Sequence, residues 1–224
     1  SSDHPLPLPG SGGLYPANSF ELCRAHLNPG GMVSRFLPLH KLRTEEFLGI
    51  LRTFQSVFPD ATVWLGHYHA VLIGGDGPMR VDFADWERRT AALGEDPHFY
   101  VDPHHLAATL MLDGATVGEL GSDSPINTDD LCYTEFFHPD CLEAGNLPAN
   151  VRFLQDNRVP LGRVFDGLAD DALMPRYLEG NVLMTESLIH SLSGDGRRGL
   201  KLLQEACSVN PENGEYPFLI RLNY

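Results

Sequence analysis

One segment limits the fold of this chain more than any other, because a strongly periodic helix lies between two short β-rich runs. Apolar side chains recur at helical spacing over residues 44–58, and Glu45 and Glu46 occupy the first turn, where carboxylates complement the helix dipole. We expect Thr44 to cap this helix. The run MVSRFLPL, from Met32, predicts a short buried strand before it, and ATVWLG predicts a strand after it. Helices that alternate with buried strands indicate an α/β layered sheet.

A third β-rich run, HAVLIGG at residues 69–75, predicts an antiparallel partner for the second strand. We therefore expect residues 32–37, 61–65 and 69–73 to be neighbours in one sheet, with the 44–58 helix packed on a face. In sheets of this class, ligands bind outside the carboxyl ends of the strands.

The opening stretch, SSDHPLPLPGSGGLYPANSFELC, is rich in proline and glycine up to a helix that we expect to begin at Pro16. Composition alone favours a disordered tail. Against that interpretation, the stretch runs directly into the helix with no polar spacer, at a place where a strand would just have ended. This position makes the opening a candidate ligand-binding loop.

The pattern becomes mostly helical after the third strand. Residues 81–93 predict a helix, and Asp102 with Pro103 begins another that we expect to run through Leu112. The segment GSDSPINTDD, from Gly121, predicts a polar loop. The apolar and aromatic stretch LCYTEFFHP follows it, and we expect its rings to pack in the core.

The end of the chain predicts two helices, at residues 171–192 and 196–209. The second matches the second helix of a tetratricopeptide unit at Gly199, Leu203, Ala206 and Pro211. One partial unit cannot form a solenoid, so the alternatives are a helical hairpin and one member of a longer repeat array. We expect a half-domain over residues 1–145 and a helical tail over residues 146–224.

The charge of the chain narrows the classes of partner. Its net charge of −14 comes from 30 acidic against 16 basic residues, which argues against a nucleic-acid partner because phosphates require a basic face. An acidic field attracts cationic partners instead. No apolar run approaches the roughly 18 residues that a membrane-spanning helix requires. Four cysteines without a C-x-x-C pair are typical of a reduced, intracellular chain.

Ten histidines are present, among them the pair His67 and His69 and the adjacent pair His104 and His105. None of the spacings matches a closed zinc site, whose ligands recur at short two-residue gaps or at helical i, i+4 positions. We therefore expect surface histidines and no metal site.

Three of these segments together resemble the carboxyl-terminal half of the spermidine synthase-like (polyamine aminopropyltransferase) family. The opening, through YPANSFELCRAHLNPGG, is similar to the family's acidic D-x-x-D-P loop and the helix after it. RTEEFLGILRTFQSVFPDATVWLG is similar to the next helix and strand. INTDDLCYTEFFHP is similar to the N-T-D-D-x-P-x-x-E-F stretch of the bacterial branch, which is often fused to a transmembrane transporter-like half. The resemblance covers about residues 1–140.

The resemblance implies a Rossmann-like methyltransferase sheet that binds S-adenosylmethionine or its decarboxylated form and alkylates an amine. The family's glycine-rich nucleotide loop lies on the first strands, and no G-x-G-x-x-G opens a helix here. We therefore expect the carboxyl-terminal half of such a sheet followed by an α-helical tail. It would lie on the cytoplasmic face of a parent protein that is anchored in the membrane through its amino-terminal half.

The resemblance also implies candidate site residues. The family's loop carries two acids, of which the first deprotonates the attacking amine and the second binds it. Only the second, Asp3, is present, and the general base is expected before Ser1. Asp129 and Asp130 are candidates for binding a small cationic amine. The alternative for residues 127–130 is an Asx-type turn whose side chains bond their own backbone, the commonest use of such residues.

Departures from the family pattern leave the acceptor open. SRFLPL stands where spermidine-forming members carry a Gln/Glu-rich strand, and GHYHAV stands where they carry a Tyr-Pro-x-Gly loop. Arg35, if it points inward, places a positive charge near a site for a cationic amine. Two alternatives follow: an inactive remnant that binds a protein partner through the helical tail, and a methyltransferase with another acceptor. Homo-oligomerisation stays open as well.

Overall fold

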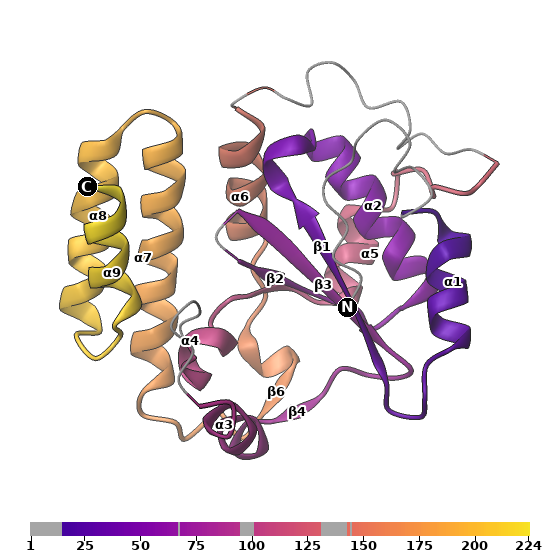
Figure 1. Ribbon diagram of the computed structural model, residues 1–224, viewed down its shortest axis with the longest axis horizontal. Coiled ribbons are helices and arrows are strands. Elements are labelled where there is room, and N and C mark those ends of the chain that lie inside the picture. The colour runs from indigo at the N-terminus through magenta and orange to yellow at the C-terminus, as the bar shows by residue number, and fades with distance from the viewer. Residues whose placement is uncertain (1–14, 67, 95–100, 131–142, 144) are drawn as a thin grey trace. The chain divides into compact units, whose positions relative to one another are not determined.

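The computed structural model describes residues 15–66, 68–94, 101–130, 143 and 145–224. The chain forms two compact units, coloured along the sequence in Figure 1. Unit 1 comprises residues 1–79 and 111–157, and unit 2 comprises residues 80–110 and 158–224. The fold is mixed α/β, as expected, with helices, a four-stranded sheet and a two-stranded sheet of β4 and β6.

A four-stranded sheet has the order β1-β3-β2-β5. Strand β3 (His69–Gly75) lies between β1 (Met32–Pro38) and β2 (Thr62–Leu65) and runs antiparallel to both. Strands β1 and β2 are therefore parallel to each other. The expectation that these three segments share a sheet, with the last two antiparallel, is confirmed.

Helix α2 (Thr44–Val57) connects β1 to β2 and confirms the predicted helix. Its apolar face is buried, and Phe54 lies in edge contact with Phe20 of α1 (Ala17–Ala25). The predicted cap was wrong by one residue, because Thr44 is already helical. The carboxylate of Glu46 instead accepts the backbone N–H of Arg43 at 2.8 Å, which satisfies one donor of the open first turn.

Strand β1 differs from the buried strand that its apolar run predicts. Leu37 and Pro38 are buried, but the side chains of Met32 and Phe36 are 64% and 60% exposed. The strand occupies one end of the strand order, so the described residues give it a single neighbour in the sheet. An apolar run reports only the composition of a strand, and it does not reveal whether a second strand or layer covers it.

The second predicted helix after the sheet is shorter than expected. Helix α4 (Pro103–Ala107) begins where predicted, and the Asp102 carboxylate accepts the backbone N–H of His105 at 2.8 Å. It does not continue to Leu112, because Leu110–Leu112 forms β5 with all three side chains buried. Short apolar runs fit a buried strand as well as a helix, and here the sheet decides.

Unit 2 is mostly helical. Helix α3 (Phe83–Ala91) confirms the first prediction there, and α7 (Met174–Leu192) and α8 (Gly196–Val209) confirm the two helices near the chain's end. The two helices approach closely at Gly199, since a Cβ there would lie 3.0 Å from the Ser187 carbonyl oxygen of α7. The boundary expected between residues 145 and 146 stays a prediction.

The remaining elements were not predicted individually. They are β4 (Val81–Asp82), β6 (Phe165–Asp166), α5 (Gly114–Leu120), α6 (Asn146–Asp156), α9 (Glu215–Asn223) and the short 3₁₀ turns Leu39–Lys41 and Leu161–Arg163. Among the described residues, every helix is too short or too polar to cross a membrane.

Candidate functional site

The sequence places its candidate site at the opening loop and at the loop of residues 127–130. Asp3 lies outside the described residues, as does the segment LCYTEFFHP. Asp129 and Asp130 are described, and both are exposed in a turn of unit 1. Their carboxylates are therefore available to a ligand in solvent.

Asn127 anchors this loop. It is fully buried, its N–H donates to Thr53 Oγ1 of α2 at 2.9 Å, and its carbonyl oxygen accepts the N–H of Ala17 at 2.8 Å. Ala17 opens α1, and its N–H is one of the donors that the helix itself leaves without a partner. The bond from Ala17 joins the helix of the first resembling segment to the INTDD loop of the third, and the bond to Thr53 joins that loop to the helix of the second. The loop is thus held through its main chain to other elements, which a local Asx turn does not require.

Arg35 of β1 lies on the α1 side of the sheet. Its guanidinium carbon is 5.9 Å from the centre of the Phe20 ring, and among the described residues its Nε is buried without a hydrogen-bond partner. Burial raises the pKa of the neighbouring Tyr15 hydroxyl, and the charge of Arg35 partly opposes that rise. A fixed positive charge therefore lies beside the first turn of α1.

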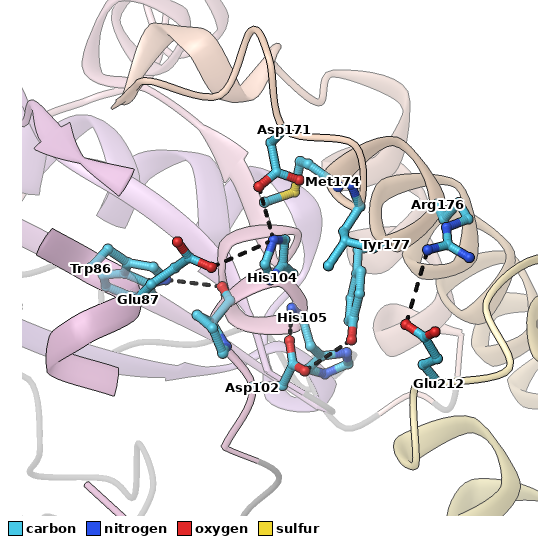
Figure 2. A network of polar contacts seen from close by, with 12 residues as sticks. Trp86, Glu87, Asp102, His104, His105, Asp171, Met174, Arg176, Tyr177 and Glu212 are labelled. Atoms are coloured by element: carbon cyan, nitrogen blue, oxygen red, sulfur yellow. Dashed lines mark hydrogen bonds and ion pairs between the residues drawn. The ribbon is translucent and has the colours of Figure 1, made fainter. Parts of the chain in front are cut away.

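A second polar cluster lies in unit 2 and was not predicted. His104 and His105 are buried, which corrects the expectation of surface histidines at these positions. His104 Nε2 lies 3.1 Å from Asp171 Oδ2 and 3.8 Å from Glu87 Oε1, as Figure 2 shows. The histidine comes from α4, Glu87 from α3 and Asp171 from the turn before α7.

Aromatic packing fixes the imidazole of His104. The Phe83 ring contacts it edge-on, with centroids 5.0 Å apart, and the Tyr177 ring lies tilted against it at 5.1 Å. Rings held between two neighbours retain little rotational freedom. The direction of Nε2 toward the two carboxylates is thus set by the core of unit 2.

The carboxylate of Asp171 is also fixed, by backbone N–H groups that follow it in the chain. Its Oδ1 accepts the N–H groups of Leu173 and Met174 at 2.8 and 2.7 Å, which leaves Oδ2 directed at His104. Burial raises the pKa of this carboxyl, but the hydrogen bonds from Met174, His104 and Leu173 and the nearby charge of His104 outweigh it, and the net pKa is lowered. The ionised carboxylate is the favoured state here.

A further set of bonds joins α4 to the helices around it. Asp102 Oδ2 accepts the hydroxyl of Tyr177 at 2.9 Å, and His105 Nδ1 lies 3.1 Å from Asn213 Nδ2. The indole N–H of Trp86 donates to the Pro103 carbonyl at 2.9 Å. These groups are hydrogen-bonded to one another, so we assign them to positioning α4 rather than to binding a ligand.

The sequence held little to reveal this cluster. The Asp102-Pro103 start signal places His104 on a helix, but Glu87 and Asp171 lie 17 residues before and 67 after it. Their approach depends on how α3, α4 and α7 pack, and local spacing does not encode that. Within the described residues, Glu87, His104 and Asp171 form the one group whose ligand atoms, all within 4.8 Å of one another, could hold a metal ion.

Comparison with known proteins yields no identification. No family model, no curated protein and no solved structure matches the chain.

Proposed function

We propose that unit 1 belongs to the carboxyl-terminal half of a spermidine synthase-like transferase, which alkylates an amine with S-adenosylmethionine or its decarboxylated form. The observation that carries this proposal is the hydrogen bond from Ala17 N–H to the Asn127 carbonyl. It joins two segments, 110 positions apart, that the resemblance assigns to opposite sides of one amine site.

The sheet supports the same proposal. Parallel strands β1 and β2 are connected through α2, the strand–helix–strand unit from which Rossmann-like sheets are built. The antiparallel β3 lies between β1 and β2 and pairs with both, so it splits this strand–helix–strand unit. Among the described residues β1 ends the strand order, so its outer backbone edge can receive further strands of a nucleotide-binding half.

The chemistry assigns separate roles to the acids. A protonated amine is not a nucleophile, so one carboxylate must accept its proton while another holds the cation in line with the sulfonium carbon. Asp3 would hold the amine, with Asp129 and Asp130 at the facing loop, and the resemblance assigns proton acceptance to the first acid of the family's loop. The new C–N bond forms as the C–S bond breaks, and the thioether leaves with the electron pair.

Two measurements test the proposal. The 224-residue chain alone should bind S-adenosylmethionine and its decarboxylated form very weakly, and micromolar binding in a calorimetric titration would contradict the division into halves. In a longer protein that includes the nucleotide-binding half, Asp3→Asn should raise the Michaelis constant for a polyamine. Loss of one charge-assisted contact costs about 1.5–3 kcal/mol, or roughly ten- to a hundredfold.

The controls separate chemistry from misfolding. Binding of S-adenosylmethionine or its decarboxylated form should be unchanged in Asp3→Asn. Asp60→Asn, at an exposed acid on the loop after α2, should change neither that binding nor the Michaelis constant for the polyamine. An unaltered Michaelis constant for the polyamine in Asp3→Asn would mean that Asp3 does not bind the amine. Equal loss of donor and acceptor binding would indicate a damaged loop.

A methyltransferase with a non-cationic acceptor is the second candidate, and Arg35 favours it. A guanidinium beside the first turn of α1 repels a cationic amine and attracts a carboxylate or phosphate. In the longer protein, Arg35→Gln should improve a polyamine acceptor if the site is for amines. The same substitution should weaken an anionic acceptor if the second candidate is correct.

A further inference from the structure

We propose that Glu87, His104 and Asp171 of unit 2 bind one divalent transition-metal ion of the Zn²⁺ class. The site is independent of the proposed transferase chemistry, because its residues lie in unit 2 and the proposed amine-binding acids lie in unit 1. Figure 2 shows the three side chains converging from three segments of the chain.

The geometry matches the coordination shell of such an ion. Ligand atoms about 2.0–2.2 Å from a tetrahedral Zn²⁺ lie about 3.4 Å from one another. Here His104 Nε2 is 3.1 Å from Asp171 Oδ2 and 3.8 Å from Glu87 Oε1, values that bracket this separation. All three ligand atoms lie within 4.8 Å of one another.

Two of the three ligands are already held in place. The side chain of His104 is 7% exposed between two aromatic rings, and that of Asp171 is 18% exposed and fixed by two backbone N–H groups. Glu87 is 43% exposed, so its carboxylate has room to close on an ion from the solvent side. A rigid pair with one adaptable ligand lowers the cost of ordering the site and leaves an entry path.

The donor set selects the class of ion. Two carboxylates balance the charge of a divalent cation, and a neutral imidazole favours zinc, iron, nickel or copper over magnesium and calcium. Binding replaces the contact between His104 and Asp171, and the imidazole must present an unprotonated Nε2, with its one proton on Nδ1. Three protein ligands leave a coordination position for water, as in open zinc sites.

A bound ion would join α3, α4 and the start of α7. The expected consequence is a rise in thermal stability, because an ion that binds only the folded state stabilises it by mass action. This readout does not depend on any enzymatic activity.

The test uses the whole 224-residue chain and Zn²⁺ as the probe. Equilibrium dialysis followed by elemental analysis should show one tightly bound equivalent, and Zn²⁺ should raise the thermal midpoint. Glu87→Gln removes one charged ligand from an exposed position and should lower affinity by more than about tenfold, since changes to residues behind the ligands already cost about 10- to 100-fold. His104→Gln should abolish the equivalent.

Two matched variants serve as controls. Glu212→Gln makes the same chemical change at an exposed carboxylate that pairs with Arg176, outside the cluster. His69→Gln replaces one member of a close histidine pair in unit 1, in which the ring centroids of His40 and His69 are 6.1 Å apart. Both should retain the tight equivalent.

The outcomes are decisive in either direction. The absence of a saturable equivalent in the wild type would overturn the proposal, and so would a Glu87→Gln variant that binds Zn²⁺ as tightly as the wild type. Loss of the equivalent in His69→Gln would move the site to unit 1 and overturn it as well. Should His104→Gln fail to fold, the comparison of Glu87→Gln with Glu212→Gln still decides.

Discussion

Two regions of the molecule gather acidic residues near the start of a helix, and they do so in different ways. In unit 1 the loop of residues 127–130 is tied to α1 and α2 through the main chain of Asn127, which leaves Asp129 and Asp130 exposed. In unit 2 the carboxylates of Asp102 and Asp171 accept N–H groups and face buried histidines or tyrosines. Main-chain anchoring leaves carboxylates available for an external ligand, whereas side-chain anchoring fixes their direction inside the unit.

The largest effect should come from the apolar core behind the unit 1 loop. Phe54 is 1% exposed and contacts Phe20 and Phe58 at centroid distances of 5.0 and 4.9 Å. Phe54→Ala should lower the free energy of unfolding by about 3–5 kcal/mol, because it leaves a cavity. Urea denaturation measures this, with Leu22→Ala at an exposed position as the control. A loss below about 1 kcal/mol, the range of ordinary substitutions, would show that Phe54 is not closely packed in the folded protein.

Asp171→Asn should give the next largest loss of unfolding free energy, and the size of that loss should depend on pH. At neutral pH the loss of a charge-assisted contact with His104 should cost about 1.5–3 kcal/mol of unfolding free energy. Because the pKa of Asp171 is lowered in the folded state, the wild type gains stability from its ionised form above the unfolded pKa. That gain disappears as the pH falls through the folded pKa.

The measurement is urea denaturation between neutral pH and about pH 3, which spans the ordinary aspartate pKa of about 3.9. The difference between wild type and Asp171→Asn should shrink toward the acid end. A difference that stays constant with pH would mean that the charge of Asp171 contributes nothing.

Much of the fold followed from local patterns, and the exceptions have physical reasons. Helical spacing fixed α2, and β-rich runs bounded by turns fixed β1, β2 and β3, since all these signals lie within a dozen or so residues. Leu110–Leu112 became a strand because burial in the sheet outweighed helical continuation. The exposure of Phe36 depends on what covers the sheet, which its own sequence does not encode.

The candidate sites divide in the same way. The INTDD loop could be singled out as a polar turn, but the bond from Ala17 to Asn127 spans 110 positions and has no local signature. The histidine pair was visible, yet its burial and the two carboxylates beside His104 arise from the packing of α3, α4 and the turn before α7. Long-range convergence of side chains lies beyond the reach of spacing rules.

Thr53→Val tests the main-chain anchor of the unit 1 loop. The buried hydroxyl accepts the Asn127 N–H and donates to the Gly49 carbonyl, and valine keeps its shape without either bond. We expect a loss of about 1–3 kcal/mol, the cost of an unsatisfied buried donor. Hydrogen exchange at the Asn127 amide should accelerate as well. Unchanged exchange at that amide would mean that the loop is held by other contacts.

The smallest effect should come from the exposed ion pair of unit 2. Arg176 and Glu212 are 4.0 Å apart with side chains 43% and 63% exposed. Glu212→Gln should change the free energy of unfolding by less than about 0.5 kcal/mol, because solvent screens such pairs. Thermal denaturation at low and high salt checks this. A larger and salt-sensitive loss would show that surface charge, rather than the buried cluster, orders this part of unit 2.

Amide chemical shifts of one isotope-labelled sample test the contrast between the two regions most directly. Titration with spermidine should shift the amides of residues 128–130 and leave those of Glu87, His104 and Asp171 in place, whereas Zn²⁺ should do the reverse. Asp76, exposed on a loop of unit 1, reports non-specific attraction of cations to the acidic chain. If spermidine moves residues 128–130 no further than Asp76, or if Zn²⁺ leaves the amides of Glu87, His104 and Asp171 unmoved, the assignment of distinct ligands to the two regions is wrong.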